Sequence, residues 1–358
     1  MLRVAHLLPN LVIGGRERIV ADLCRDAPDD GIDPFVIAYD PAADPAGQFA
    51  VEAPVIAVDR RDPGFARQLR DWLTDARIDV LHAQGHVSAA LARRGLGDVP
   101  MVATLHIALG TGWRWALPVA RGLRAAREVT AVSDDLARRY RPLAGRPIRT
   151  IATGVDLGRF AARERTCQSD RSFTLGIAAR LHPVKRHQDA LAALRILQER
   201  GLSCRLEIAG DGPRAAELAR LAQDLDVRLL GTVTDMPGWL ATLDGFMLVS
   251  DHEGTPAALI EAMAASLPCI ATRVGGMPAL AGDAALLVPR RSPRAIADAI
   301  ERLIRDPGLR RDLANAARDR AAQFGTDRQS SAYREIYRQC VAGPHHLHDK
   351  FVIQPPSP

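Results

Sequence analysis

The sequence predicts an α/β protein of two Rossmann-like, doubly wound domains that face each other across a cleft. The length of 358 residues exceeds that of a typical single core. Short apolar runs alternate with helix-length segments in both halves of the chain, as they do in repeated βα units with a parallel sheet. Between Asp156 and Ser172 this periodicity fails and the chain is polar, which predicts a linker.

The first half opens with an apolar run over residues 2–8, a Gly14-Gly15 turn, and apolar residues at helical spacing. This pattern predicts a strand, a glycine loop and a helix. A further helix is expected over residues 65–76. The other predicted strands of this half cover residues 35–38, 55–58, 80–82, 102–105 and 129–132.

The second half repeats the pattern. Strands are expected over residues 174–178, 206–209, 227–230 and 246–249, with helices over 188–200 and 214–224. The predicted division is an N-terminal Rossmann-like domain over 1–160, a C-terminal Rossmann-like domain over 172–325, a helix over 326–342 that could belong to either half, and a flexible tail over 343–358. The tail contains three histidines, which we interpret as incidental rather than as metal ligands: His345, His346 and His348.

Composition limits the classes of function. Apolar residues form 47% of the chain and charged residues 25%, as in ordinary globular proteins. The 47 Lys and Arg exceed the 42 Asp and Glu, which favours anionic partners but also fits codon bias. Five scattered cysteines without C-x-x-C spacing indicate reduced thiols. With no signal-peptide pattern and no long apolar run, a cytoplasmic protein is expected.

The stretch from residue 251 to residue 280 is the most informative. Thr255 is predicted to cap a helix that begins at Pro256, directly after the apolar strand over 246–249. Free N–H groups at such a helix start suit a diphosphate. Glu253 and Glu261 flank this position, and a carboxylate can accept paired hydrogen bonds from vicinal hydroxyls. A sugar nucleotide has a diphosphate with a sugar at each end, so this arrangement of groups suits such a ligand.

This segment resembles the signature of glycosyltransferase family four, whose members are retaining enzymes of GT-B fold. The resemblance implies that Glu253 contacts the transferred sugar and that Glu261 binds the nucleotide ribose. It also implies that the backbone of Gly254, Thr255, Pro256 and Ala257 holds phosphate and sugar. It covers the chain from Gly14 to about Leu280 and is more specific in the second half.

Two cations follow the predicted strand over 174–178. Arg180 and Lys185 stand where they can neutralise a diphosphate leaving group, and they are similar to the family's Arg and Lys pair. Ala179 and Arg186 replace glycines that are usual in the family. Arg186 is a candidate third cation, and solvated loop charges are the alternative interpretation.

In the first half, Gly14 and Gly15 resemble the family's Gly-Gly-x-Glu loop, where backbone can approach a ligand closely. It is not a dinucleotide fingerprint. His106 follows a predicted strand and matches the family's histidine near the reacting sugar. His82 and Ser133 are weaker candidates at other strand ends. The Thr-Gly-Val-Asp segment over 153–156 is interpreted as a turn at the domain end.

Trp113 and Trp115 precede Arg121, Arg124 and Arg127 in a segment expected to be helical. Aromatic residues beside arginines suit a membrane surface, an anionic acceptor or a solvated helix face. The sequence thus allows peripheral contact with the inner face of the membrane.

The function that this resemblance implies is transfer, with retention, of a hexose-type sugar from a UDP-sugar or GDP-sugar to a glycan or lipid-linked acceptor, in envelope or exopolysaccharide synthesis. No cofactor or metal is expected, because Arg180 and Lys185 would balance the phosphate charge. Nucleic-acid binding is not expected, since no recognition motif is present. The alternatives are a GT-B sugar-nucleotide epimerase and a non-catalytic sugar-nucleotide-binding protein.

Overall fold

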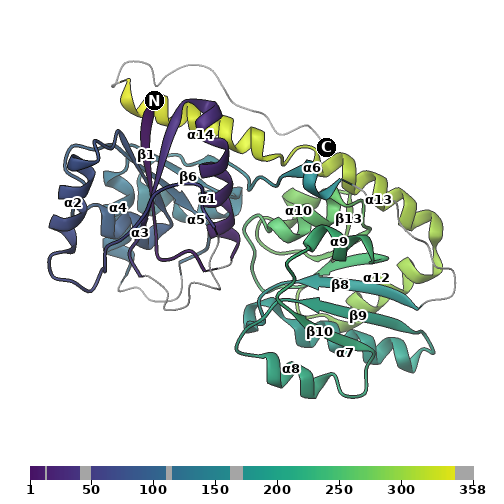
Figure 1. The fold of residues 1–358 in the computed structure, drawn as a ribbon. Coiled ribbons are helices and arrows are strands. Elements are labelled where there is room, and N and C mark those ends of the chain that lie inside the picture. The colour runs from purple at the N-terminus through teal and green to yellow at the C-terminus, as the bar shows by residue number, and fades with distance from the viewer. Residues whose placement is uncertain (13, 41–49, 110–114, 162–171, 343–358) are drawn as a thin grey trace.

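The computed structural model describes residues 1–12, 14–40, 50–109, 115–161 and 172–342. Two parallel sheets form the centres of two domains, and helices cover both faces of each sheet (Figure 1). Strands buried on both faces are mostly apolar, which is why short apolar runs marked them in the sequence. The predicted fold class of two Rossmann-like domains is confirmed.

The first sheet has seven strands in the order β3-β2-β1-β4-β5-β6-β7, and all neighbouring strands run parallel. The direction in which the strand order grows reverses between β1 and β4, and such a reversal is where doubly wound sheets bind ligands. The strands are β1 (Leu2–Leu8), β2 (Ile32–Ala38), β3 (Val55–Ala57), β4 (Val80–Gln84), β5 (Met101–Leu105), β6 (Glu128–Ala131) and β7 (Arg149–Thr150).

Helices from different parts of the chain cover the two faces of this sheet. Apolar side chains of four helices form a large core on one face: α2 (Phe65–Asp75), α3 (His86–Ala92), α4 (Ala116–Ala125) and α5 (Asp134–Ala144). The opposite face packs against α1 (Gly15–Asp26) and the last helix, α14 (Thr326–Val341).

The second sheet has six parallel strands in the order β10-β9-β8-β11-β12-β13, with the same kind of reversal between β8 and β11. Its strands are β8 (Phe173–Ala178), β9 (Cys204–Ala209), β10 (Val227–Gly231), β11 (Gly245–Leu248), β12 (Cys269–Thr272) and β13 (Ala285–Val288). Helices α7 (His187–Glu199), α8 (Ala215–Leu221) and α12 (Pro293–Arg305) share one core. Helices α9 (Met236–Ala241), α10 (Ala257–Ala264), α11 (Met277–Ala281) and α13 (Pro307–Ala321) contribute to the other.

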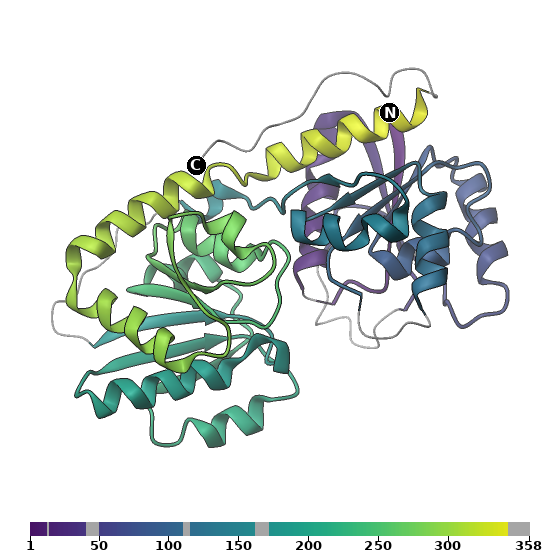
Figure 2. The same ribbon diagram turned by 180° about the vertical axis from the view of Figure 1, so that it is seen from behind.

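The chain crosses between the domains twice. The first crossing passes through a short helix, α6 (Leu157–Phe160), and Val155 forms a β-bridge with Gly325 at the second crossing. Gly154 has no room for a side chain, because a Cβ there would lie 2.8 Å from the Cα of Thr326. From this point α14 runs back over the first domain (Figure 2). The sequence did not decide to which domain this helix belongs. The buried side chains of Tyr333 and Tyr337 place α14 on the first sheet.

Several expectations fall on residues outside the described ranges: Trp113, Cys167 and the three tail histidines. Cys24, Cys204, Cys269 and Cys340 are buried free thiols, as the spacing of the cysteines indicated. Within the described ranges, no helix is both long enough and apolar enough to cross a bilayer.

Candidate functional site

Loops from the carboxyl ends of both sheets meet at the boundary between the domains. Gly254 follows β11 of the second sheet and touches the first domain, because a Cβ there would lie 2.9 Å from Val132 Cγ2 and 3.1 Å from the carbonyl oxygen of His106. His106 and Val132 directly follow β5 and β6. The structure therefore brings His106 and the Glu253-Gly254 loop together from opposite domains.

Glu253 and Lys185 form an ion pair at the second domain's strand ends. Lys185 lies in a 3₁₀ turn (Pro183–Lys185) after β8, and its Nζ is 2.5 Å from Glu253 Oε1. Ser250 Oγ donates to the same oxygen at 2.6 Å, and Glu253 is only 8% exposed. Two predicted site residues, one acidic and one basic, thus form an ion pair with each other.

The start of α10 differs from the prediction. The helix begins at Ala257 rather than at Pro256, and Pro256 occupies the N-cap position without a side-chain cap. The Thr255 hydroxyl does not cap the helix, because it donates to the carbonyl oxygen of Val132 in the other domain. The predicted cap was therefore wrong. No side chain of this segment occupies the free N–H groups at the start of α10.

Glu261 lies one turn into α10 and is 7% exposed. It accepts no hydrogen bond from the residues that the structure describes. Burial raises the pKa of its carboxyl group, and this rise is opposed by the charges of Arg18 and Arg159. A buried carboxylate without a hydrogen-bond donor is costly unless a ligand supplies one.

Arg180 follows β8 and is exposed, and it forms no ion pair with a described residue. The glycine turn after β9 supports its backbone. Leu181 N donates to Asp211 O at 2.9 Å, and a Cβ at Gly210 would lie 2.1 Å from Ala179 O. The backbone beside Arg180 is thus fixed by these contacts, and the exposed guanidinium is available to bind an anion.

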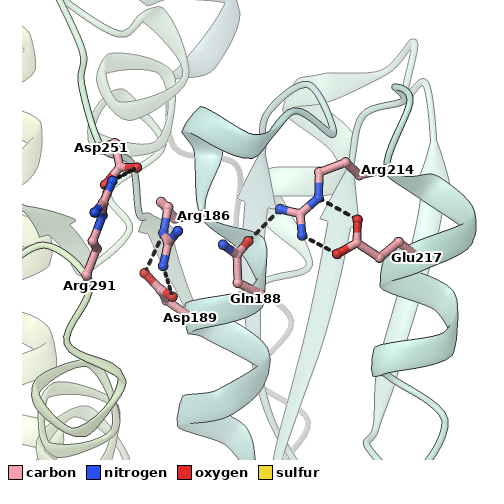
Figure 3. A network of polar contacts seen from close by, with 7 residues as sticks. All are labelled: Arg186, Gln188, Asp189, Arg214, Glu217, Asp251 and Arg291. Carbon is pink, nitrogen blue, oxygen red and sulfur yellow. Dashed lines mark hydrogen bonds and ion pairs between the residues drawn. The ribbon is translucent and has the colours of Figure 1, made fainter.

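Arg186, the candidate third cation, is already paired. Its Nε and Nη2 donate to Asp189 at 3.0 and 2.8 Å, across the first turn of α7 (Figure 3). Asp251 is held in the same way by Arg291, at 2.7 and 2.8 Å, and this pairing lowers the pKa of the Asp251 carboxyl group. Arg186 therefore has a local role that Arg180 lacks.

In the first domain, Gly15 begins α1 and no atom lies within 4 Å of the place that a Cβ would take. His106 is half-buried, and desolvation lowers the pKa of its imidazole to about 3, with smaller contributions from Arg16 and His86. The ring is therefore neutral at physiological pH. Its Nε2 is 2.8 Å from Oε1 of Gln84, a fully buried residue at the end of β4.

The two weaker candidates of the first domain each have hydrogen-bond partners within the protein. His82 does not end its strand, which continues to Gln84, and it is fully buried between Tyr337 of α14 and Thr104. Ser133 is buried and caps α5 by accepting from Leu136 N at 3.4 Å. Strand-end placement alone did not distinguish these residues from His106.

Comparisons with known proteins agree with this geometry. Residues 13–159 match the family described as Glycosyltransferase Family 4, and residues 172–306 match Glycosyl transferases group 1. A D-inositol 3-phosphate glycosyltransferase of Pseudarthrobacter chlorophenolicus is 30% identical over 311 residues, which cover 76% of this chain and 74% of that protein. The chain belongs to glycosyltransferase family 4.

Other similar proteins are also glycosyltransferases. N-acetyl-alpha-D-glucosaminyl L-malate synthase of Bacillus anthracis is 28% identical over 77% of this chain and 78% of its own length. Among solved structures, Anabaena HepE in complex with UDP-glucose superposes with a TM-score of 0.81 at 20% identity, over 95% of this chain and all of that one. This likeness shows the GT-B fold, and the family shows that the protein is a transferase.

Sequence reasoning missed two features of this family 4 glycosyltransferase. Gly275 and Gly276 pack against the Glu253-Gly254 backbone, and Gly276 N donates to Glu253 O at 3.1 Å. A Cβ at Gly275 would lie 1.9 Å from Glu253 O, so the paired glycines were the available signal. The second feature is Gln84, for which neither motif nor spacing gave a signal.

Proposed function

We propose that this glycosyltransferase moves a hexose-type sugar from a nucleoside diphosphate sugar to a glycan or glycolipid acceptor, with retention at the anomeric carbon. The observation that carries the proposal is the buried Glu261 carboxylate, which lacks a hydrogen-bond donor among the described residues. It lies in the helix whose free N-terminal N–H groups suit a diphosphate. Vicinal ribose hydroxyls would supply the missing donors.

The diphosphate would lie between Arg180, Lys185 and the Gly254–Ala257 backbone. Lys185 would exchange part of its contact with Glu253 for phosphate oxygens, and this exchange would free Glu253 to bind a sugar hydroxyl. Charge that develops on the departing phosphate is stabilised most by fixed cations and N–H dipoles. These groups would therefore act mainly in the transition state.

In the proposed reaction the acceptor hydroxyl oxygen forms a bond to the anomeric carbon from the side on which the bond to the phosphate oxygen breaks. The electron pair of the broken bond stays on the nucleoside diphosphate, and the hydroxyl proton passes to the departing phosphate oxygen. His106 does not donate this proton, because the low pKa of its ring keeps it neutral. We assign His106 to holding the transferred sugar.

The names of similar proteins support the order in which donors and acceptors are tested. HepE was solved with UDP-glucose, and WaaG, with a TM-score of 0.73, is described as involved in lipopolysaccharide biosynthesis. A UDP-sugar is therefore the first donor to test, and an envelope glycan or glycolipid is the first acceptor.

The decisive experiment measures Tm of the purified protein with UDP, GDP, ADP, their common sugar conjugates and NAD. A ligand that binds only the folded state raises Tm. We expect one nucleoside diphosphate and its sugar to do so selectively, and turnover to release that nucleotide when an acceptor is added. Conversion of the donor, in the absence of an acceptor, to a sugar nucleotide with an epimeric hexose would identify an epimerase. Binding without turnover for any acceptor would identify a binding protein.

We further propose peripheral contact with an anionic membrane through the exposed face around the start of α4. Trp115 is 42% exposed and Leu117 is 58% exposed, and Arg121 lies exposed on the next turn. Apolar side chains beside an arginine suit the headgroup region. The protein should sediment with vesicles of phosphatidylcholine and phosphatidylglycerol but not with phosphatidylcholine alone, and Leu117→Asp should abolish sedimentation. Equal binding of the variant would exclude this surface.

A further inference from the structure

Behind His106 lies a group of buried polar side chains on the face of the first sheet that α14 covers. Gln84 is fully buried at its centre, and its Oε1 lies 2.8 Å from His106 Nε2. Its Nε2 lies 3.1 Å from His6 Nδ1 and 3.2 Å from His82 Nδ1. One amide side chain thus contacts three imidazole rings, and only the ring of His106 reaches the interdomain site.

These contacts determine which nitrogen of His106 carries the proton. An amide oxygen accepts hydrogen bonds only, so His106 Nε2 must be the donor. The two amide hydrogens then face Nδ1 of His6 and Nδ1 of His82, and the Tyr337 hydroxyl lies 2.6 Å from the same His82 nitrogen. With the amide turned over, Nδ1 of His6 and Nδ1 of His82 would both have to donate to its oxygen, and then one amide hydrogen and the Tyr337 hydroxyl hydrogen would have no acceptor in this group. The observed orientation leaves fewer donors without an acceptor.

Because the His106 ring is neutral, the nitrogen that carries the proton determines what the other nitrogen can do. Burial lowers the pKa of His106 to about 3, with smaller contributions from Arg16 of α1 and His86 of α3, and His6 and His82 are also buried with lowered pKa values. A neutral imidazole has one donor and one acceptor nitrogen. If Nε2 is the donor, Nδ1 is the acceptor, and Nδ1 has no partner among the described residues.

We propose that Gln84 is a positioning residue that holds His106 as the Nε2–H tautomer and presents Nδ1 as a hydrogen-bond acceptor to a hydroxyl group of the transferred sugar. This inference rests on the proposed function, because it needs a sugar in the interdomain site. It assigns to the site a preference for a sugar that offers a hydroxyl hydrogen at this point. A rotated ring or the other tautomer would present an N–H instead.

The first test is a two-bond ¹H–¹⁵N spectrum of the histidine rings in the full chain, for wild type, Gln84→Met and Gln84→Glu. Wild type should show the Nε2–H tautomer at His106. Methionine keeps the shape of the side chain but accepts only weakly, so Gln84→Met should give a mixture of tautomers. Glutamate keeps an acceptor oxygen opposite His106 and should restore Nε2–H. Ser88→Ala is the matched control, since Ser88 bonds to the backbone carbonyl of Gln84 and leaves its amide intact.

The second test separates the sugar from the nucleotide. Affinities are measured by calorimetry for whichever of UDP-glucose, UDP-N-acetylglucosamine, GDP-mannose and ADP-glucose raises Tm most, and for its nucleoside diphosphate. Gln84→Met should lose roughly three- to tenfold in affinity for the sugar nucleotide, the value of one hydrogen bond. Its affinity for the nucleoside diphosphate should not change. Gln84→Glu should recover the sugar contact and introduce a pH dependence, because a carboxylate beside the ring raises the pKa of His106.

Two results would overturn the inference: an Nδ1–H tautomer at His106 in wild type, or a Gln84→Met protein with unchanged tautomer and unchanged ratio of the two affinities. Failure of the proposed function is distinguishable from either. In that case wild type binds no sugar nucleotide, and the ring spectrum still reports whether Gln84 holds His106. If Gln84→Met does not fold, the wild-type spectrum and Gln84→Glu decide the question.

Discussion

Replacement of Glu261 by glutamine should affect stability and ligand binding in opposite directions. In the ligand-free protein the Glu261 carboxyl group is buried, and burial raises its pKa. A group with a raised pKa in the folded state binds its proton more tightly there than in the unfolded chain. Below the unfolded pKa both states hold the proton and nothing is lost. As pH rises from the unfolded pKa through the folded pKa, ionisation of the carboxyl group destabilises the fold, by about 1.4 kcal/mol for each tenfold difference in proton affinity between the two states.

Glutamine has nearly the same shape without the charge. Glu261→Gln should therefore raise Tm of the ligand-free protein at pH 8 and have little effect near pH 4. Each 1 kcal/mol corresponds to about 2–4 °C for domains of this size. The same change replaces charge-assisted hydrogen bonds to the ribose with weaker ones. At about 1.5–3 kcal/mol for bonds to a charged group, affinity for the nucleoside diphosphate should fall by about tenfold to a hundredfold.

The assay is differential scanning fluorimetry of wild type and Glu261→Gln from pH 4 to pH 8, with and without the nucleotide that stabilises the wild type. Glu335→Gln on α14 is the matched control, because Glu335 is a helical glutamate outside the site. A variant that is no more stable than wild type at pH 8, and that binds the nucleotide equally well, would refute both the desolvation argument and the ribose assignment.

Three further predictions concern the phosphate site, its independence of metal and the domain boundary. Arg180→Ala should lower kcat roughly a hundredfold or more while donor affinity changes only a few-fold, since the cation acts on charge that develops in the transition state; equal losses in both would contradict this role. Treatment with EDTA should leave turnover unchanged, because Arg180 and Lys185 balance the diphosphate, and restoration by Mn²⁺ after loss would show a metal requirement. Thr255→Val should lower kcat/KM about fivefold, because it removes the hydroxyl bond to Val132 across the domains; steady-state kinetics that match wild type would make that contact incidental.

Most strands of both domains could be predicted because burial on both faces leaves a local signal, whereas β7, β12 and β13 were not predicted. Apolar runs such as residues 2–8 and 102–105 predicted their strands within one residue at each end. Strands with polar ends were predicted too short. The strand β4 continues past His82 to Gln84, because the polar side chains at its end are buried on the face that α14 covers. The pattern of apolar residues cannot show that a distant helix will supply partners for polar ones.

The candidate donor residues could also be named from the sequence. Glu253, Glu261, Arg180 and Lys185 occur in short segments whose spacing already indicates a strand end and a helix start. The exact start of that helix was not readable, because the Thr255 hydroxyl found a partner in the other domain instead of a local N–H group. Local capping rules hold only where no tertiary acceptor competes.

The sequence alone thus determined the two-domain architecture and indicated a candidate site at the strand ends with its charged residues, because these follow from periodicity and short-range spacing. Tertiary structure alone decided which candidates act together. It placed Gly254 against His106, covered His82 with α14, and set Gln84 behind the His106 ring. Contacts between residues tens to hundreds of positions apart depend on how the two sheets and the last helix pack. No local pattern in the chain records that packing.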